Sequence, residues 1–309
     1  MSAGLIKIGT RDSILATWQA DHVSKLLKQQ GYQTELVFIK TEGDRVLDTP
    51  LPLLGGKGVF TKALDDALLN NEVDIAVHSF KDIPTTMPEG LEVVAILERE
   101  DPRDVLVARD SINFLNDEKS IGLIATSSHR RGGQWLNKYS NHSLTDIRGN
   151  IHTRLKKLQE SNWDGAIFAA AGLIRAELED KISVYLDWMV PAPAQGAIAV
   201  MCKEHRPEIE RSMINLHHSE TAICTRIERR FLQVLEGGCS APLGAFAYVE
   251  NMQVYFKGVL TSLDGSLREE IEVSMPLEHS SSLGDKAAES MMDRKVVMDI
   301  LAEIRRDAS

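Results

Sequence analysis

Short apolar runs recur along the first two thirds of the chain, and stretches with helical periodicity lie between them. Such runs, bounded by turn-forming residues, indicate buried strands. We predict strands at 5–10, 34–40, 74–78, 91–97, 105–108, 121–125, 143–147, 165–169 and 197–201. We predict helices at 13–29, 59–70, 130–138, 151–160 and 171–175. This alternation is typical of an α/β fold with a mostly parallel sheet.

Two segments interrupt the alternation of strand and helix. Residues 98–103 are charged and contain a proline, and the stretch Pro191-Ala192-Pro193 precedes the last of these strands. We interpret them as two crossings between two α/β lobes, a clamshell plan with a ligand cleft between the lobes. Residues 1–98 and 191–214 are then expected to form the first lobe, and residues 99–190 the second.

The pattern changes after residue 214. A long helix is predicted at 218–235, and a terminal helix at 284–306 closes the chain. Between them lie three strand-like runs, at 241–249, 253–261 and 268–274. Helices and strands that are segregated along the sequence indicate an α+β arrangement. We therefore predict a small α+β C-terminal domain over residues 215–309.

The composition is that of a globular protein without a membrane anchor. The chain has 309 residues, of which 43% are apolar and 26% charged. No apolar run approaches the roughly 20 residues needed to span a bilayer. The first apolar stretch begins at residue 5, which leaves no room for a signal peptide, so a cytoplasmic protein is expected. Three widely spaced cysteines and the histidine spacing predict neither a disulfide framework nor a metal site.

Charge is unevenly distributed along the chain. The net charge of −10 argues against general nucleic-acid binding. Between residues 126 and 175, however, eight Lys and Arg stand against three acids, which gives a local charge of +5. A solvated helix face is the simpler interpretation for Lys156 and Lys157. For the arginines we favour an anionic small-molecule partner.

The end of the strand at 74–78 carries the most informative short motif. Ser79, Lys81 and Asp82 follow this strand, and open α/β sheets bind ligands at the carboxyl ends of their strands. The adjacent lysine and aspartate offer a donor and an acceptor to one ligand, and Asp82 can stabilise a nearby cation. An ordinary surface ion pair is the alternative.

Polar and basic side chains mark the other junctions between strands and helices. Arg11 and Ser13 follow the first strand, and the later junctions carry Thr126, Ser127, Ser128, Arg130, Arg131, Arg148, Gly149, Asn150, Arg154 and Arg175. Free amides at helix N-termini favour anions, and guanidinium forks bind carboxylates. Arg130 and Arg131 in a first helical turn oppose the helix dipole unless an anion compensates them. We therefore predict that these junctions together form a binding site for an anion.

Two glycine-rich segments lead to different predictions. The stretch Gly55-Gly56-Lys57-Gly58 lacks the spacing of a nucleotide-binding loop, and a lid that carries Lys57 is predicted instead. Cys239 follows two glycines on a turn, where a cysteine is more exposed than in a core and can form a thiolate. A buried structural cysteine is the alternative, and it suits Cys202 and Cys224.

Seven stretches, in their order along the chain, resemble the porphobilinogen deaminase (hydroxymethylbilane synthase) family. They read RDSILA (11–16), GGKGVFTK (55–62), HSFKDIPT (78–85), REDPRD (99–104), TSSHRR (126–131), IRGNIHTRL (147–155) and LEGGCS (235–240). The resemblance extends over nearly the whole chain and loosens after residue 249. Seven ordered motifs are far more specific than any one of them.

The resemblance implies a fold of two periplasmic-binding-protein-like α/β lobes, joined by a double crossing, and a small α+β C-terminal domain. It also implies a transferase of tetrapyrrole and haem biosynthesis. Such an enzyme condenses four porphobilinogen molecules on a dipyrromethane cofactor, releasing ammonia and then hydroxymethylbilane. A monomer is expected, with no metal and with neither nucleic acid nor membrane as a partner.

Roles for individual residues also follow from the resemblance. Cys239 would hold the dipyrromethane through a thioether, and Asp82 would be catalytic by bonding pyrrole nitrogens and stabilising the cation formed when ammonia leaves. The residues implied in cofactor and substrate binding are Arg11, Ser13, Lys57, Ser79, Lys81, Thr126, Ser127, Ser128, Arg130, Arg131, Arg148, Gly149, Asn150, Arg154, Arg175 and Gln195.

Several positions depart from the family's pattern. Ile14 replaces a common proline, His129 a leucine, His152 a small or amide residue, and Ala194 the first glycine of Gly-Gln-Gly. None of these changes removes a charged or nucleophilic group. Two rival interpretations remain: a clamshell binding protein for a small carboxylate ligand, which needs no Gly-Gly-Cys turn, and a family member that has lost catalysis.

Overall fold

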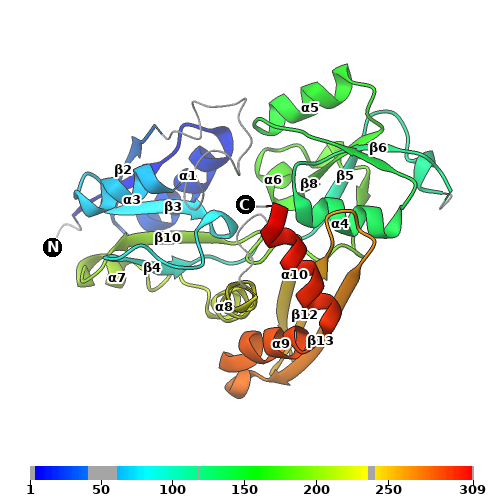
Figure 1. Cartoon of the computed structure of the whole chain (residues 1–309). Helices are drawn as coiled ribbons and strands as arrows, with labels where there is room; N and C mark the ends of the chain where they lie inside the picture. The colour runs from blue at the N-terminus through cyan, green and yellow to red at the C-terminus, as the bar shows by residue number, and fades with distance from the viewer. Residues whose placement is uncertain (1–3, 41–60, 117–118, 236–240, 308–309) are drawn as a thin grey trace. The chain divides into compact units, whose positions relative to one another are not determined.

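The computed structural model describes residues 4–40, 61–116, 119–235 and 241–307. Contacts divide the chain into two compact units, Met1–Glu100 with Gly196–Ala222 and Asp101–Gln195 with Ile223–Ser309. Each α/β lobe is built on one five-stranded sheet, and a three-stranded sheet forms the C-terminal part (Figure 1). The predicted fold class is thereby confirmed, whereas the domain boundaries at residues 98, 190 and 214 stay predictions.

The sheet of the first unit has the strand order β2-β1-β3-β10-β4. Its strands are β1 (Leu5–Thr10), β2 (Gln33–Phe38), β3 (Ile75–Ser79), β4 (Leu91–Ile96) and β10 (Ile198–Lys203). β1 is parallel to β2 and to β3, while β10 is antiparallel to both of its neighbours. The prediction that a late strand returns to the first sheet is confirmed, and this strand separates β3 from β4.

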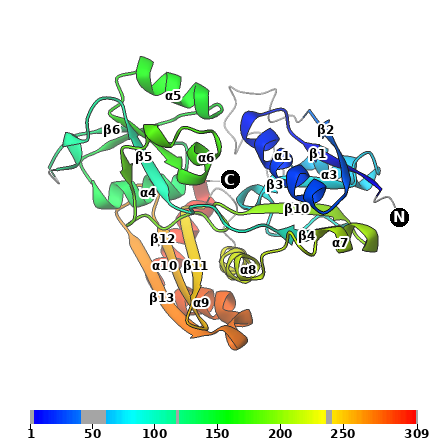
Figure 2. The same cartoon turned by 180° about the vertical axis from the view of Figure 1, so that it is seen from behind.

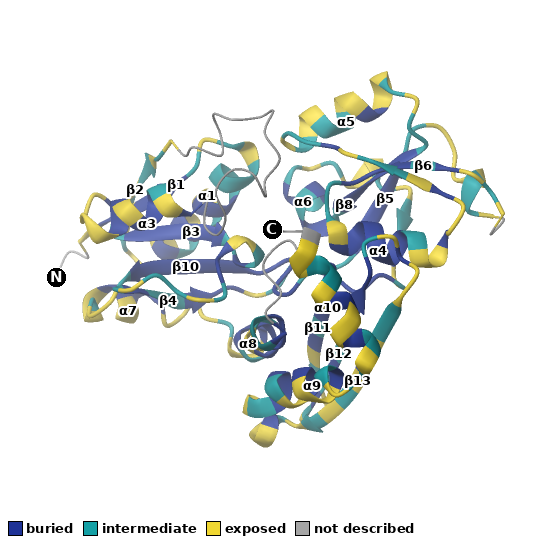
Figure 3. Cartoon of the chain, in the orientation of Figure 1, coloured by how far each residue is buried: buried dark blue, intermediate teal, exposed yellow. Residues whose placement is uncertain are grey.

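Helices cover both faces of this sheet. Alternate strand residues such as Ile75 and Val77 pack with α1 (Ile14–Gln29) and α7 (Pro207–Met213) in one apolar cluster. On the other face, a Cβ added to Gly9 would lie 3.0 Å from Leu64 of α3 (Lys62–Leu69). Figure 3 shows β3 and β10 as buried along most of their length. The short α7, which begins with a proline, was not predicted.

The sheet of the second lobe has the order β7-β6-β8-β5-β9. Its strands are β5 (Asp104–Ala108), β6 (Leu123–Ala125), β7 (Ser143–Thr145), β8 (Gly165–Ala169) and the unpredicted β9 (Val184–Tyr185). β6 is parallel to β7 and β8, and β5 is antiparallel to β8 and β9. The first residue of β5, Asp104, therefore lies at the same edge as the carboxyl end of β8.

The helices of this lobe are α4 (His129–Lys138), α5 (Ile151–Glu160) and α6 (Ala170–Arg175). Val105 and Val107 of β5 pack with residues of α5 and α6, whereas Leu106 packs with Trp135 of α4. Because side chains alternate along a strand, Asp104 faces α4 together with Leu106. This orientation places a carboxylate beneath the first turn of α4.

The C-terminal part is an antiparallel sheet covered on one face by helices. Its strands are β11 (Leu243–Glu250), β12 (Gln253–Thr261) and β13 (Arg268–Pro276), in sequence order. Residues of α8 (Ser219–Val234), α9 (Leu283–Met292) and α10 (Lys295–Asp307) form one apolar core with them. Figures 1 and 2 show α9 and α10 beside β12 and β13. Short 3-10 helices are found at Phe80–Asp82, Asn113–Leu115, Glu179–Lys181 and Leu277–Ser282.

The prediction of one terminal helix is wrong, because the chain breaks between α9 and α10. The amide of Asp293 donates to Glu289 O, and that of Arg294 to Met291 O, which ends the first helix. The Arg294 guanidinium then donates to Glu269 Oε2 and Glu270 O of β13, both at 2.9 Å. These contacts hold the break against the sheet, although the hydrophobic period continues across it.

No helix within the described ranges combines the length and apolar character needed to cross a bilayer.

Within the second unit, α4 packs closely against the end of β12. A Cβ added to Gly133 would lie 2.7 Å from the backbone oxygen of Ser262 and would also overlap the Thr261 side chain. Asn137 Nδ2 donates to Gly265 O at 2.9 Å one turn further along α4. The absence of a side chain at position 133 therefore permits this contact.

We predict that Gly133→Ala lowers the free energy of unfolding by about 1–3 kcal/mol, because the new methyl group overlaps backbone that cannot move aside. The matched control is Gly132→Ala in the same helix, where the nearest atom is Leu144 Cδ1 at 2.8 Å, the end of a flexible side chain. Calorimetric melting of both variants measures the difference. Equal stability of the two would contradict the close packing of α4 on β12.

Candidate functional site

Two neighbouring parallel strands end at one edge of the first sheet. β1 is followed by Arg11 and Ser13, and β3 ends in Ser79 and is followed by Lys81 and Asp82. The parallel register pairs Ile8 with Ile75 and Gly9 with Ala76, so the carboxyl ends of both strands lie at the same edge of the sheet. Five of the residues that the sequence predicted, all within the described part of this unit, are thus brought to one edge.

The two serines of this edge are occupied by structural hydrogen bonds. Ser13 caps α1, and its hydroxyl accepts from the Ala16 amide at 3.3 Å. Gln19, which is buried within α1, donates from Nε2 to Ser79 Oγ at 2.8 Å. Together these contacts fix the start of α1 to the end of β3. The two hydroxyls therefore fix the positions of the strand end and the helix start at this edge.

Asp82 lies on a single 3-10 turn, Phe80–Asp82, directly after β3. Phe80 is buried and anchors the turn, and its amide donates to Ala197 O at 3.0 Å. Lys81 is half-buried and Asp82 is exposed. The carboxylate of Asp82 is thus held on a fixed turn while it remains accessible to a ligand.

His78 is a buried imidazole beneath the same edge, with 6% of its surface exposed. Burial, and then the positive charge of the nearby Arg11, lower the pKa of His78 to about 4. Within the described part of the chain, His78 Nε2 has no hydrogen-bond partner. The ring is therefore neutral at physiological pH and adds no positive charge to this edge.

At the edge of the second sheet, the predicted hydroxyl and amide residues organise the backbone. Ser128 caps α4 by accepting from the Arg131 amide, and Asn150 caps α5 by accepting from the Thr153 amide at 2.9 Å. Ser127 Oγ accepts from the Ile147 amide at 2.9 Å and donates to its carbonyl at 3.0 Å. Thr126 is buried, and its hydroxyl accepts from the Ser128 amide at 3.2 Å. These contacts tie the loop after β6 to the loop after β7.

The turn before α5 depends on Gly149. Its φ of +113° lies outside the region that side chains favour, and an added Cβ would lie 2.7 Å from Thr153 Cγ2. Arg154 donates from Nε to Gly149 O at 2.7 Å, and the adjacent Arg148 is half-buried. Arg175, the last residue of α6, is buried with 6% exposure. The turn is therefore fixed by the conformation of Gly149 and by the hydrogen bond from Arg154.

Arg130 and Arg131 are buried and bind one carboxylate, that of Asp104. Arg130 Nη1 lies 2.6 Å from Asp104 Oδ2, and Arg131 Nε lies 2.9 Å from Oδ1. Exposure is 4% for Arg130, 8% for Arg131 and 0% for Asp104. From the sequence, an arriving anion was predicted to offset these cations at the helix start. The structure corrects this in part, because Asp104 compensates one of the two charges.

The charge state of this cluster follows from its contacts. Burial alone would raise the pKa of Asp104, but Arg130 and Arg131 together hold the pKa of that carboxyl well below its usual range. Guanidinium groups remain protonated in proteins, even though burial lowers the pKa of Arg131. Two cations and one anion leave one net positive charge in a buried site.

Gln195 belongs to the same cluster. Its Nε2 donates to Pro102 O at 2.7 Å and to Asp104 Oδ1 at 3.1 Å. The preceding Ala194, which replaces the family's glycine, has φ of 62°, in the left-handed region that favours glycine. Its amide donates to Glu228 Oε2 at 2.7 Å, and Glu228 is fully buried. These contacts fix the segment that contains Ala194 and Gln195 and precedes β10, hereafter the returning segment.

Two predicted residues, Lys57 and Cys239, lie outside the described residues. The alternative reading of the other two cysteines as structural is confirmed, since Cys202 and Cys224 are buried. The residue pattern did not indicate Asp104 as a member of this cluster, although a charged residue directly before an apolar strand was an available signal.

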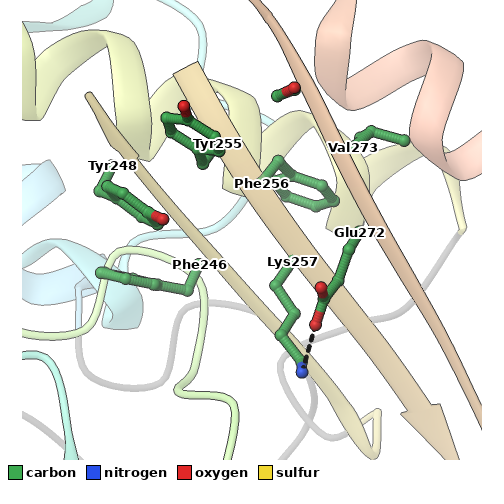
Figure 4. A pocket seen from close by; sticks show the side chains of 8 residues that line it. Phe246, Tyr248, Tyr255, Phe256, Lys257, Glu272 and Val273 are labelled. Carbon is green, nitrogen blue, oxygen red and sulfur yellow. Dashed lines mark hydrogen bonds and ion pairs between the residues drawn. The ribbon is translucent and has the colours of Figure 1, made fainter. Parts of the chain in front are cut away.

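A surface hollow of about 350 Å³ lies elsewhere, on the uncovered face of the C-terminal sheet (Figure 4). Phe246, Tyr248 and Tyr255 stack there with ring centroids 5.9 and 5.1 Å apart, and Lys257 Nζ lies 2.6 Å from Glu272 Oε1. The hollow contains none of the predicted site residues. We therefore define the candidate site by the charged side chains at the ends of the strands, and not by this hollow.

Comparison with known proteins gives matches along nearly the whole chain. A family model described as porphobilinogen deaminase, dipyromethane cofactor binding domain, matches residues 6–211, and its C-terminal domain model matches residues 222–293. The porphobilinogen deaminase of Desulfitobacterium hafniense is 44% identical over 306 residues, which are 98% of each protein. That of Geotalea uraniireducens is 41% identical over 308 residues, 98% of this chain and 96% of the relative.

Among solved structures, a probable amino-acid ABC transporter extracellular-binding protein of Bacillus subtilis aligns with a TM-score of 0.43. It is 12% identical, and the alignment covers 69% of this chain and 90% of that protein.

We predict that His78 makes the protein less stable in mild acid. The unfolded chain protonates this histidine near pH 6.5 and the folded chain only near pH 4, so stability falls as pH falls through that window. The shift corresponds to a loss of about 2 kcal/mol between pH 7 and pH 5. Urea unfolding of the protein and of His78→Leu at both pH values isolates the contribution. An identical pH dependence in both proteins would contradict the assignment.

Proposed function

The chain belongs to the porphobilinogen deaminase family, and from that premise we propose how its residues divide the work of the reaction. As a member of this family it is a transferase of tetrapyrrole biosynthesis, with a dipyrromethane cofactor and porphobilinogen as its substrate. It condenses four porphobilinogen molecules and releases hydroxymethylbilane. The roles of individual side chains are our proposal.

The buried net positive charge of Arg130, Arg131 and Asp104 is the observation that carries this proposal. Each pyrrole ring of the cofactor and substrate bears two carboxylate arms, and guanidinium groups bind carboxylates in bidentate fashion. A buried excess of one positive charge is costly until an anion arrives, so the cluster fits a carboxylate. When bound, the dipyrromethane supplies the pyrrole end on which the chain grows.

The other basic residues extend this carboxylate-binding role. We assign Arg148, Arg154 and Arg175 to the acidic arms at the second sheet, where the Asn150 cap fixes the turn that carries Arg148 and the start of the helix that carries Arg154. Arg11 and Lys81 have the same role at the first sheet. Neutral His78 beneath Arg11 supports this assignment, because it leaves that guanidinium as the charged group. Lys57 is assigned to a lid.

Asp82 is assigned the catalytic role. Its exposed carboxylate on a fixed turn accepts hydrogen bonds from pyrrole N–H groups and stabilises the positive charge that develops as ammonia leaves. Ser79 and Gln19 support Asp82 indirectly, because their hydrogen bond fixes the end of β3. A clamshell protein that only binds carboxylates needs no such acid, and this distinguishes the two functions.

Cys239 is assigned as the attachment point of the cofactor. A thiolate is the nucleophile that forms a thioether, and the two preceding glycines permit close approach of a bulky group. We also propose that the protein acts as a monomer in the cytoplasm.

We predict that Asp82→Asn lowers kcat by about 10²–10³-fold, because it removes the charge that stabilises the developing cation. Asp82 is exposed, so the melting temperature should hardly change. The matched control is Asp12→Asn, an exposed carboxylate at the same edge that should retain activity. Steady-state assays with porphobilinogen measure both. Full activity of Asp82→Asn would contradict the catalytic assignment.

We predict that the purified protein carries a mass excess of one dipyrromethane and that Cys239→Ser removes it. The reason is that a hydroxyl is a far weaker nucleophile than a thiolate. Cys224→Ser serves as the control, because that buried cysteine should leave the added mass in place. Intact-mass spectrometry gives the answer. The bare polypeptide mass in active protein would rule out the tether.

A further inference from the structure

Asp104 binds both guanidinium groups of the arginine pair through its two oxygens. Oδ2 accepts from Arg130 Nη1 at 2.6 Å, while Oδ1 lies 3.2 Å from Arg130 Nη2 and 2.8 Å from Arg131 Nη2. Oδ1 also accepts from Gln195 Nε2 at 3.1 Å. Donors from α4 and from the returning segment therefore converge on one carboxylate, at the first residue of β5.

Backbone carbonyls hold the opposite sides of the two guanidinium groups. Arg130 Nη1 also donates to Val190 O at 2.9 Å, and Arg131 Nη1 donates to Ile167 O at 3.1 Å. Gln134 fixes the first of these carbonyls, since its side chain bonds both the amide and the carbonyl of Val190. Each guanidinium thus has its plane set by Asp104 on one side and by the backbone on the other.

Stability alone does not account for a cluster of two cations and one anion. Buried ion pairs are often no more stable than apolar side chains of equal volume, and an unmatched buried charge is costly. Without Asp104, two adjacent guanidinium groups would repel each other in a site of low dielectric. With Asp104, one positive charge remains at the carboxyl edge of β6 and β8, where α/β sheets bind ligands.

We propose that Asp104 is a positioning residue for the cofactor: it orients Arg130 and Arg131 and reduces their joint charge to one, so that the cluster accepts a single carboxylate arm. This inference rests on the proposed use of the two arginines for carboxylate groups. Asp104 acts through the arginines and does not itself touch the reacting atoms.

The first test compares Asp104→Asn with Glu228→Gln. Both substitutions remove one negative charge from a fully buried carboxylate in the same unit while preserving its shape. Glu228 accepts from the amides of Ala194 and Ala247, both at 2.7 Å, whereas Asp104 binds the two guanidinium groups. Both variants should melt at a lower temperature, so a loss of stability is common to the two and the position of the removed charge is what differs.

The readout is the fraction of folded, purified protein that carries the dipyrromethane mass, measured by intact-mass spectrometry on material with a cooperative melt. We expect Asp104→Asn to reduce this fraction at least ten-fold, because misaligned guanidinium groups lose bidentate contact with the carboxylate. Glu228→Gln should load as the unaltered protein does. Equal loading of the two variants would overturn the proposal.

A second pair of variants covers the case in which Asp104→Asn does not fold. Asp104→Glu keeps the charge of the cluster but displaces the carboxylate by one methylene group, and Glu228→Asp makes the converse displacement at the control position. Reduced loading of Asp104→Glu alone supports positioning by geometry. Normal loading of Asp104→Glu would overturn the requirement for a fixed orientation.

Arg131→Gln separates this inference from the proposed function on which it rests. If Arg131→Gln loads the cofactor normally, the carboxylate-binding role of the arginine fails, and the role of Asp104 fails with it. If Arg131→Gln does not load while Asp104→Asn does, only the inference about Asp104 is wrong. Loss of loading in both variants, with Glu228→Gln unaffected, supports both.

Discussion

Two buried guanidinium groups around one buried carboxylate set the geometry of the second lobe. Asp104 is the first residue of β5, and Arg130 and Arg131 lie in the first turn of α4. Gln195 joins them from the segment before β10. Charges that are removed from water must be paired or they destabilise the fold. This requirement fixes the start of α4, the start of β5 and the segment before β10 together, and one net positive charge remains in the cluster.

Parallel strands explain why the other functional side chains gather as they do. β1 and β3 in the first sheet, and β6, β7 and β8 in the second, each end at one edge. Short hydroxyl and amide side chains then cap the following helices, which satisfies amides that lack partners within the helix. Caps such as Ser13, Ser128 and Asn150 thereby hold the loops that carry the charged side chains.

The sequence was sufficient to predict the α/β layers, because period-two and period-3.6 patterns report directly which side chains face a core. It was insufficient where the deciding contact is distant in sequence. The break between α9 and α10 depends on Arg294 reaching β13, and the amphipathic pattern continues across it. Likewise, Arg130 and Arg131 read as ligand-binding groups, and only the fold reveals that Asp104 already neutralises half of their charge. Proximity of charges is a tertiary property that residue spacing does not encode.

We propose that the arginine pair binds a carboxylate arm of the oligopyrrole while Asp104 keeps the pair oriented. A crystal structure of the protein after incubation with porphobilinogen tests this most directly. We expect a pyrrole carboxylate within about 3 Å of Arg130 or Arg131, with the Asp104 contacts retained. Oligopyrrole carboxylates that contact neither guanidinium, with Arg130 and Arg131 bound to protein atoms alone, would contradict it.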